Sequence, residues 1–157
     1  MKKAILLSLS LLLTPTAFAA SEMDEALLSV GLIDKNYEYT HKALVTEFFR
    51  LVTSDYSQSL PMDTNSYTRI QSMMLTPYYG SVDVLFTLPL TSDERDLLID
   101  ELSSKEILKE ACLDYYLPNK FMLANNFTMV YSYSDKNFRP LKDIKMNADT
   151  CINALIN

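Results

Sequence analysis

The stretch SYTRIQSMMLTPYYGSVDVLFTL, residues 66–88, decides the fold because it reads as two β-strands joined by a turn. Residues 66–75 alternate with a period of two, the period at which a strand presents its two faces. Residues 76–80 include proline and glycine, which favour a turn. The apolar positions after the turn share one face of a second strand: Val82, Val84, Phe86 and Leu88. Residues 66–88 therefore predict a β-hairpin.

A second pair of alternating stretches lies near the end of the chain. Residues 127–134 place Phe, Met and Tyr on one face and mostly polar side chains on the other. Residues 135–137 have the composition of a turn, and a further alternating stretch passes through Ile144 and Met146 and ends at Cys151. These patterns predict a third and a fourth strand, which form a second hairpin.

Two helices are predicted before the first hairpin. Residues 21–31 predict a short helix that ends near Gly31. In residues 37–55, apolar side chains at positions i, i+4, i+7 and i+8 predict an amphipathic helix with one apolar face. That face consists of Leu44, Phe48, Leu51 and Val52.

A long helical segment is predicted between the hairpins. Thr91 and Glu94 have the spacing of a capping box, so a helix begins there. Residues 103–106 repeat this spacing, which indicates that the helix restarts, carries Cys112 and ends before Pro118. A short helical or irregular stretch then leads to the third strand.

Two hairpins separated by helices predict an α+β fold. We expect a four-stranded antiparallel sheet, made of the two hairpins, packed on one face against three or four helices. Residues 20–157 contain no repeat and no Pro-, Gly- or Ser-rich tract that marks a linker. They therefore predict a single domain.

Residues 1–19, MKKAILLSLSLLLTPTAFA, have the parts of an export signal peptide. Lys2 and Lys3 form its charged region, residues 5–13 form its apolar region, and Ala17-Phe18-Ala19 fits the small-x-small cleavage rule. The apolar region is about half the roughly twenty residues that span a bilayer, which disfavours an uncleaved membrane anchor. We predict cleavage near Ala19 and a mature protein in the periplasm, with further secretion left open.

Charge restricts the partners of the protein. The chain carries 14 basic and 20 acidic side chains, and removing Lys2 and Lys3 changes its net charge from −6 to −8. Nucleic acids and anionic membranes attract basic surfaces, so an acidic chain without a basic stripe argues against both. No apolar run after residue 19 reaches membrane length. We expect a partner that is another envelope or secreted protein, and the sequence leaves the oligomeric state open.

The two cysteines, Cys112 and Cys151, both lie in the exported part of the chain. An oxidising compartment lets a disulfide persist, and closing a loop of about forty residues stabilises a fold by roughly 4 kcal/mol in the chain-entropy model. A redox pair or half of a metal site is the alternative, but the chain has no CxxC spacing and its one histidine is His41. We predict a structural disulfide between Cys112 and Cys151.

The sequence offers no recognisable constellation for catalysis, for a cofactor or for a metal, and it lacks the GxSxG, HExxH, P-loop and GxGxxG patterns. His41 is interpreted as a surface histidine and not as half of a Ser-His pair. The carboxylates of the third helix suit a solvated face and the helix dipole better than an acid-base pair for glycoside cleavage. These carboxylates are Asp93, Glu94, Asp96, Asp100 and Glu101. We predict that the protein is not an enzyme.

Tyrosine supplies the candidate contact residues. Tyr78 and Tyr79 lie in the predicted hairpin turn, where an aromatic ring has little core to enter, and exposed tyrosine is a common anchor of protein interfaces. The alternative is that the turn folds back and both rings cover the edge of the sheet. Four further tyrosines are interpreted as packing residues, beside the disulfide or on a strand face: Tyr115, Tyr116, Tyr131 and Tyr133.

Short motifs form a pattern within residues 60–151: Leu60-Pro61, Thr68-Arg69-Ile70, Cys112, Tyr131-Ser132-Tyr133-Ser134-Asp135 and Asp149-Thr150-Cys151. This pattern resembles small exported bacterial proteins of the quorum-sensing-regulated virulence factor type. The resemblance implies an α+β domain with one disulfide between the late helix and the last strand. It brings no catalytic residue with it. Where such proteins often have glycine in the last turn, this chain has Asn137.

Three functions are compatible with these features. The first is a non-enzymatic periplasmic protein-interaction module, an accessory factor in envelope, pilus or secretion-system assembly or in virulence. The second is an immunity or inhibitor protein, because strong acidity suits the capture of a basic toxic effector. The third is a hydrolase with an unconventional site, which requires His41 or the acidic helix to line a deep pocket.

Overall fold

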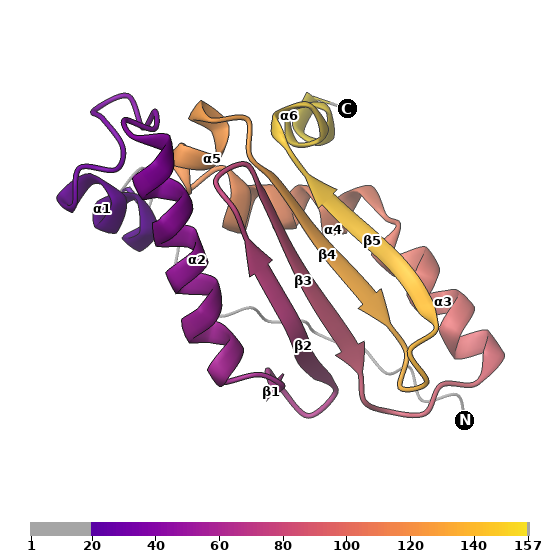
Figure 1. Cartoon of the computed structure of the whole chain (residues 1–157). Helices are drawn as coiled ribbons and strands as arrows, with labels where there is room; N and C mark the ends of the chain where they lie inside the picture. Colours follow the sequence, from indigo (N-terminus) through magenta and orange to yellow (C-terminus); the bar gives the residue numbers. More distant parts are fainter. Residues whose placement is uncertain (1–19, 157) are drawn as a thin grey trace.

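The computed structural model describes residues 20–156, so the predicted signal peptide and Asn157 lie outside the described residues. None of the helices in residues 20–156 has the length and hydropathy that crossing a membrane requires. In chain order the elements are α1 (Glu22–Ser29), α2 (Lys42–Gln58), β1 (Met62–Asp63), β2 (Thr68–Leu75), β3 (Tyr79–Phe86), α3 (Ser92–Leu102), α4 (Lys105–Ala111), the π-helical turn η1 (Cys112–Tyr116), α5 (Lys120–Ala124), β4 (Thr128–Ser134), β5 (Pro140–Met146) and α6 (Ala148–Ile156) (Figure 1).

Both predicted hairpins are confirmed. β2 pairs antiparallel with β3, and β4 pairs antiparallel with β5. The turn of the second hairpin is held by Asp135, whose buried carboxylate accepts hydrogen bonds from the backbone N–H groups of Asn137 and Arg139. Burial alone would raise the pKa of Asp135, but these bonds and the Arg139 guanidinium hold that pKa below its ordinary value.

The sheet has five strands and is mixed, so the prediction of four antiparallel strands is wrong. The strands lie in the order β1-β2-β3-β4-β5, and β3 pairs with β4 in parallel. A parallel pair needs a crossover of a dozen or more residues, and residues 87–127 supply one that contains α3, α4, η1 and α5. Strand periodicity identified the two hairpins but carried no information on how they pair with each other. The additional strand, β1, has two residues, too few to form a pattern.

Capping side chains mark the starts of α3 and α4. Thr91 Oγ1 accepts a hydrogen bond from Glu94 N, and the Glu94 carboxylate accepts one from Thr91 N, which confirms the predicted start of α3. Ser104 Oγ accepts a hydrogen bond from Ile107 N at the start of α4, so the predicted restart is also confirmed. Residues 20–156 contain more than the three or four helices expected, because the start of α6, through Cys151, was interpreted as strand and α5 was left undecided.

The disulfide between Cys112 and Cys151 is confirmed, with 5.4 Å between the two Cα atoms. The prediction that it joins a helix to the last strand is wrong, because β5 ends at Met146 and Cys151 lies on α6. Asn147 begins this helix: its side-chain oxygen accepts a hydrogen bond from Thr150 N, and its own N–H donates to Thr150 Oγ1. The disulfide therefore ties the last helix to the end of the crossover.

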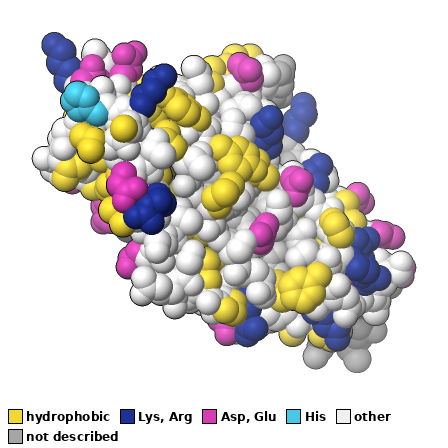
Figure 2. Space-filling view, in the orientation of Figure 1, with side chains coloured by type: hydrophobic (Ala, Val, Ile, Leu, Met, Phe, Trp, Pro, Cys, Tyr) yellow, Lys and Arg dark blue, Asp and Glu magenta, His cyan; other side chains and the backbone are white. Residues whose placement is uncertain are grey.

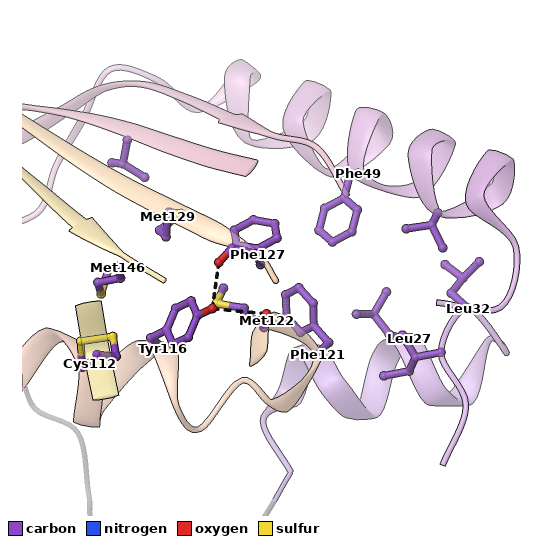
Figure 3. Close-up of a cluster of buried hydrophobic side chains, with 14 of the residues drawn as sticks. Leu27, Leu32, Phe49, Cys112, Tyr116, Phe121, Met122, Phe127, Met129 and Met146 are labelled. Atoms are coloured by element: carbon purple, nitrogen blue, oxygen red, sulfur yellow. Dashed lines mark hydrogen bonds between the residues drawn. A yellow bond between two sulfur atoms is a disulfide. The ribbon is translucent and has the colours of Figure 1, made fainter. Parts of the chain in front are cut away.

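Most of the core lies between the sheet and the helices α1, α2, η1 and α5. Figure 3 shows Phe49 of α2 facing the rings of Phe121 and Phe127, at centroid distances of 6.1 and 6.4 Å. Tyr116 is fully buried beside them, and its hydroxyl donates to the backbone oxygen of Phe127 at 2.8 Å. The hydroxyl also lies 3.3 Å from the backbone oxygen of Met122, so this buried polar group is satisfied.

The buried face of α2 overlaps the predicted one only in part, because Phe48 and Val52 are partly buried and Phe48 packs against the core. Val45 and Phe49 are buried, whereas Leu44 and Leu51 are 59% and 53% exposed. Both sets recur at helical spacing, so periodicity alone does not choose between them. The ring of Phe49 enters the aromatic core, and this contact leaves Leu44 and Leu51 of the predicted face on the outside of the helix.

One face of the sheet is left uncovered by the helices. In Figure 1, α3 and α4 lie behind the sheet and α2 runs along the outer side of β2, where Leu75 N donates to Thr53 Oγ1 at 2.9 Å. Val82 and Met129 face the helices and are buried, while Asp83 on the opposite face is exposed. The packing of helices on one face of the sheet thus agrees with the sequence prediction.

A buried carboxylate joins α1 to α5. Asp24 is fully buried and accepts hydrogen bonds from Lys120 N at 2.9 Å and from Phe121 N at 3.0 Å. These amides form the first turn of α5, and the residue before them, Asn119, makes no side-chain capping bond. Asp24 therefore caps a helix that lies about a hundred residues later in the chain.

Replacing both Cys112 and Cys151 with alanine is expected to lower the free energy of unfolding by about 4 kcal/mol. The disulfide joins residues 39 positions apart, and without it the unfolded chain regains the conformational entropy of that loop. Urea denaturation followed by circular dichroism measures the change. Wild-type protein treated with a reductant serves as the control and should unfold like the double variant. Two free thiols in mass spectra of the exported wild-type protein would contradict the structural role of this pair.

Asp24→Ala is expected to lower the free energy of unfolding by about 3 kcal/mol, because a buried amide, that of Phe121, and a partly buried one, that of Lys120, lose their carboxylate acceptor. Asp24→Asn should cost less, since its amide oxygen still accepts one of the two hydrogen bonds. Asp96→Ala on the exposed side of α3 is the control and should stay within about 0.5 kcal/mol of the wild type. Equal unfolding midpoints for Asp24→Ala and Asp96→Ala would refute the capping role.

Candidate interaction surfaces

Tyr39 holds the turn between β2 and β3 in place through a hydrogen bond and a ring contact. The Tyr39 hydroxyl donates to the backbone oxygen of Pro77 at 2.6 Å, and its ring meets that of Tyr78 edge-on, with 5.7 Å between centroids. Burial raises the pKa of Tyr39, and the neighbouring Tyr78 raises it further, so the hydroxyl remains a donor. Tyr78 is still 46% exposed. The anchored turn presents half of this ring to solvent.

Tyr79 lies on the uncovered face of the sheet, away from Tyr78. It is 38% exposed, and the next residue, Gly80, is buried on the helix side. Met74 of β2 lies opposite Ser81 in the register, and Val130 of β4 lies opposite the same residue on the other side. Met74, Tyr79 and Val130 therefore surround Ser81, and we call these three residues the sheet patch. Figure 2 shows hydrophobic surface over this upper part of the sheet.

Acidic side chains lie next to the sheet patch. The register aligns Ser72, Asp83, Ser132 and Asp143 in one row across β2, β3, β4 and β5. The Ser72 hydroxyl donates to the Asp83 carboxylate. Figure 2 shows acidic side chains on the middle of the same face. The sequence analysis did not identify this row or the sheet patch, because both depend on the pairing of β3 with β4. The only sign of the row in the sequence was the polar residue that each strand carries at the aligned position.

The four tyrosines that the sequence assigns to packing lie in or against the core: Tyr115, Tyr116, Tyr131 and Tyr133. Tyr115 meets Tyr131 edge-on, with 6.1 Å between ring centroids, on the helix side of the sheet. Burial raises the pKa of both Tyr131 and Tyr133, and the Tyr115 hydroxyl raises that of Tyr131 further. These side chains therefore remain neutral and support the core.

The residues considered for catalysis are not brought together. His41 is exposed at the start of α2, and its side chain makes no capping bond. The acidic residues predicted on α3 are exposed, and the Glu94 carboxylate is bound by the backbone N–H of Thr91, which lowers its pKa. Within the described part of the chain, no three His, Cys, Asp or Glu residues are grouped so that they can hold a metal ion.

Comparison with known proteins gives a likeness of fold. No protein-family model matches the chain, and no curated protein matches it. The crystal structure of a "putative secreted protein" from Pseudomonas aeruginosa is 13% identical with a TM-score of 0.52, and the match covers 70% of this chain and 95% of that one. The pilotin of the Vibrio vulnificus type 2 secretion system is 12% identical with a TM-score of 0.45, over 70% of this chain and 94% of that one.

At these identities the Pseudomonas structure establishes a shared α+β fold, and the pilotin is too distant to add to it. The resemblance to the virulence factor type stays a prediction. The assignment of Tyr78 and Tyr79 as contact residues also stays a prediction. The two rings have different surroundings, since Tyr78 packs against Tyr39 and Tyr79 lies on the uncovered face of the sheet.

Tyr39→Phe is expected to lower the free energy of unfolding by about 1 kcal/mol, because the carbonyl of Pro77 loses its donor. Tyr67→Phe, on a ring that is 47% exposed, is the matched control and should leave stability unchanged. Amide hydrogen exchange should show faster exchange in residues 76–79 of Tyr39→Phe. Unchanged exchange in this turn would show that Tyr39 does not anchor it.

Proposed function

We propose that the protein is a non-enzymatic interaction module of the bacterial envelope, an accessory factor for pilus, secretion-system or other envelope assembly, or for virulence. The disulfide supports an oxidising, extracytoplasmic location, since such bonds rarely persist in the cytosol. The shared fold with a protein described as secreted is compatible with this location. Cleavage of the export signal near Ala19 belongs to the same proposal.

The sheet patch is the observation that carries the proposal. Met74 and Tyr79 are 45% and 38% exposed on a face that none of the helices in residues 20–156 covers. Tyrosine and methionine are enriched in the cores of protein interfaces, where burial of a large side chain supplies most of the binding energy. Asp83 and Asp143 lie beside them and would orient a partner that carries Lys or Arg. The partner is therefore expected to be a protein with an apolar contact flanked by basic residues.

An immunity or inhibitor protein is the alternative that Asp83 and Asp143, in the row across the sheet, favour. A basic toxic enzyme would meet the same carboxylates of Asp83 and Asp143, and the net charge of −6 for the full chain adds long-range attraction. The two functions differ in what the partner does. An assembly partner is a structural component, whereas an effector loses its catalytic activity when it is bound.

Affinity capture tests the proposal. Purified protein lacking residues 1–19 is immobilised and incubated with envelope extract of the producing bacterium, and bound proteins are quantified by mass spectrometry. A partner recovered by the wild type should fall at least about tenfold with the double variant Met74→Ala/Tyr79→Ala, because a hot-spot pair contributes more than one factor of ten in affinity. Assaying the captured partner for enzymatic activity with and without the protein separates assembly from inhibition.

Leu97→Ala is the matched control, because Leu97 is 68% exposed on α3, away from the sheet patch. It should recover the same partner as the wild type. Equal recovery by the double variant, or no protein enriched over empty beads, would overturn the proposal.

A further inference from the structure

The outward face of α2 keeps large apolar side chains exposed. Leu44 and Leu51 are 59% and 53% exposed, and Phe48 between them is only partly buried. These positions, at i, i+4 and i+7, form a continuous stripe along the helix. The side chains that enter the core, Val45 and Phe49, belong to a different face. α2 therefore carries a second apolar face that residues 20–156 bury only in part.

This face forms one wall of an open groove between α2 and α1. The groove has a volume of about 540 Å³. Its apolar lining comes from Met23 and Ala26 of α1 and from Phe48, Leu51, Val52 and Tyr56 of α2. Tyr56 is 47% exposed, so its ring borders the groove without closing it.

The shape of the groove favours a helix as its occupant. A pocket for a small molecule encloses most of its ligand, whereas this groove is largely open to solvent. Its two walls are helices, and a third helix can pack its own apolar ridge between the ridges of both. Recognition of this kind uses apolar anchors at i, i+3, i+4 and i+7 of an amphipathic helix.

The charge of the groove indicates which charged residues should flank the apolar stripe of the bound helix. Its lining includes two carboxylates, Glu22 and Asp55, and contains no Lys or Arg. The neighbouring Arg50 forms an ion pair with Glu47, with 2.6 Å between Nη2 and Oε1. Its positive charge is therefore balanced by Glu47 and not by the carboxylates of the groove. An occupant that places basic residues at the edges of its apolar stripe complements these two carboxylates.

We propose that the groove between α1 and α2 is a second docking site, distinct from the sheet patch, that binds an amphipathic α-helix with a leucine-rich face and flanking lysines or arginines. The proposal does not depend on the function of the sheet patch. The two surfaces use different residues, so each can fail without the other.

A designed peptide tests the site. The probe is a fluorescein-labelled peptide of about fourteen residues, roughly four helical turns, with Leu at i, i+3, i+4 and i+7 and Lys at the flanks. Fluorescence anisotropy should show saturable binding to the wild type. Leu51→Glu should weaken binding at least about tenfold, and Asp55→Lys should weaken it about threefold and reduce its dependence on salt. Leu97→Glu on α3 is the matched control and should bind like the wild type.

Two further peptides test the chemistry of the occupant. A peptide with scrambled leucine spacing and a peptide with a central proline should both bind at least about tenfold more weakly, because neither presents a continuous apolar helical face. Circular dichroism confirms that each protein variant is folded. Absence of saturable binding, equal binding by the scrambled or proline peptide, or unchanged binding by Leu51→Glu would overturn the proposal. The variant Met74→Ala/Tyr79→Ala should bind the peptide normally, which separates this site from the sheet patch.

Discussion

The parallel pairing of β3 with β4 is the constraint on which the rest of the structure depends. These strands follow each other along the sheet, so the chain must cross from the end of one to the start of the other, and residues 87–127 make this crossover. The crossover puts α3 and α4 on one face and leaves the other face open (Figure 1). Gly80 lies where the two strands meet, and a Cβ there would come within 2.6 Å of Met129 Sδ and 3.1 Å of the Phe127 ring.

Two ties hold the end of this crossover in place. The disulfide fixes the start of η1 to α6, and the Asp24 carboxylate fixes the start of α5 to α1. The segment between them carries Tyr116 and Phe121, which fill the core. The covalent tie reduces the freedom of the unfolded chain, and the polar tie satisfies amides that burial would otherwise leave without acceptors. The two contributions are physically independent and act on the same short segment.

Two apolar surfaces remain exposed after residues 20–156 have folded. The sheet patch and the groove between α1 and α2 both expose large apolar side chains beside carboxylates. Scattered apolar residues are common on protein surfaces, but contiguous ones that the fold leaves unpaired mark binding sites more often. In both proposals these carboxylates are the groups that a basic partner would contact. Some of the acidic residues that give the chain its net negative charge thus lie at these two surfaces.

The sequence by itself determined the local elements: the two hairpins, the starts of α3 and α4, the disulfide, and the assignment of Tyr131 and Tyr133 to packing. These follow from contacts between residues close in the chain, or, for the disulfide, from there being two cysteines. The tertiary structure alone decided the parallel pair, the buried face of α2, the helix that carries Cys151, and the different surroundings of Tyr78 and Tyr79. Each of these depends on contacts between distant segments. Leu44 and Phe49 are equally apolar along the helix, and only the aromatic core that receives Phe49 distinguishes them.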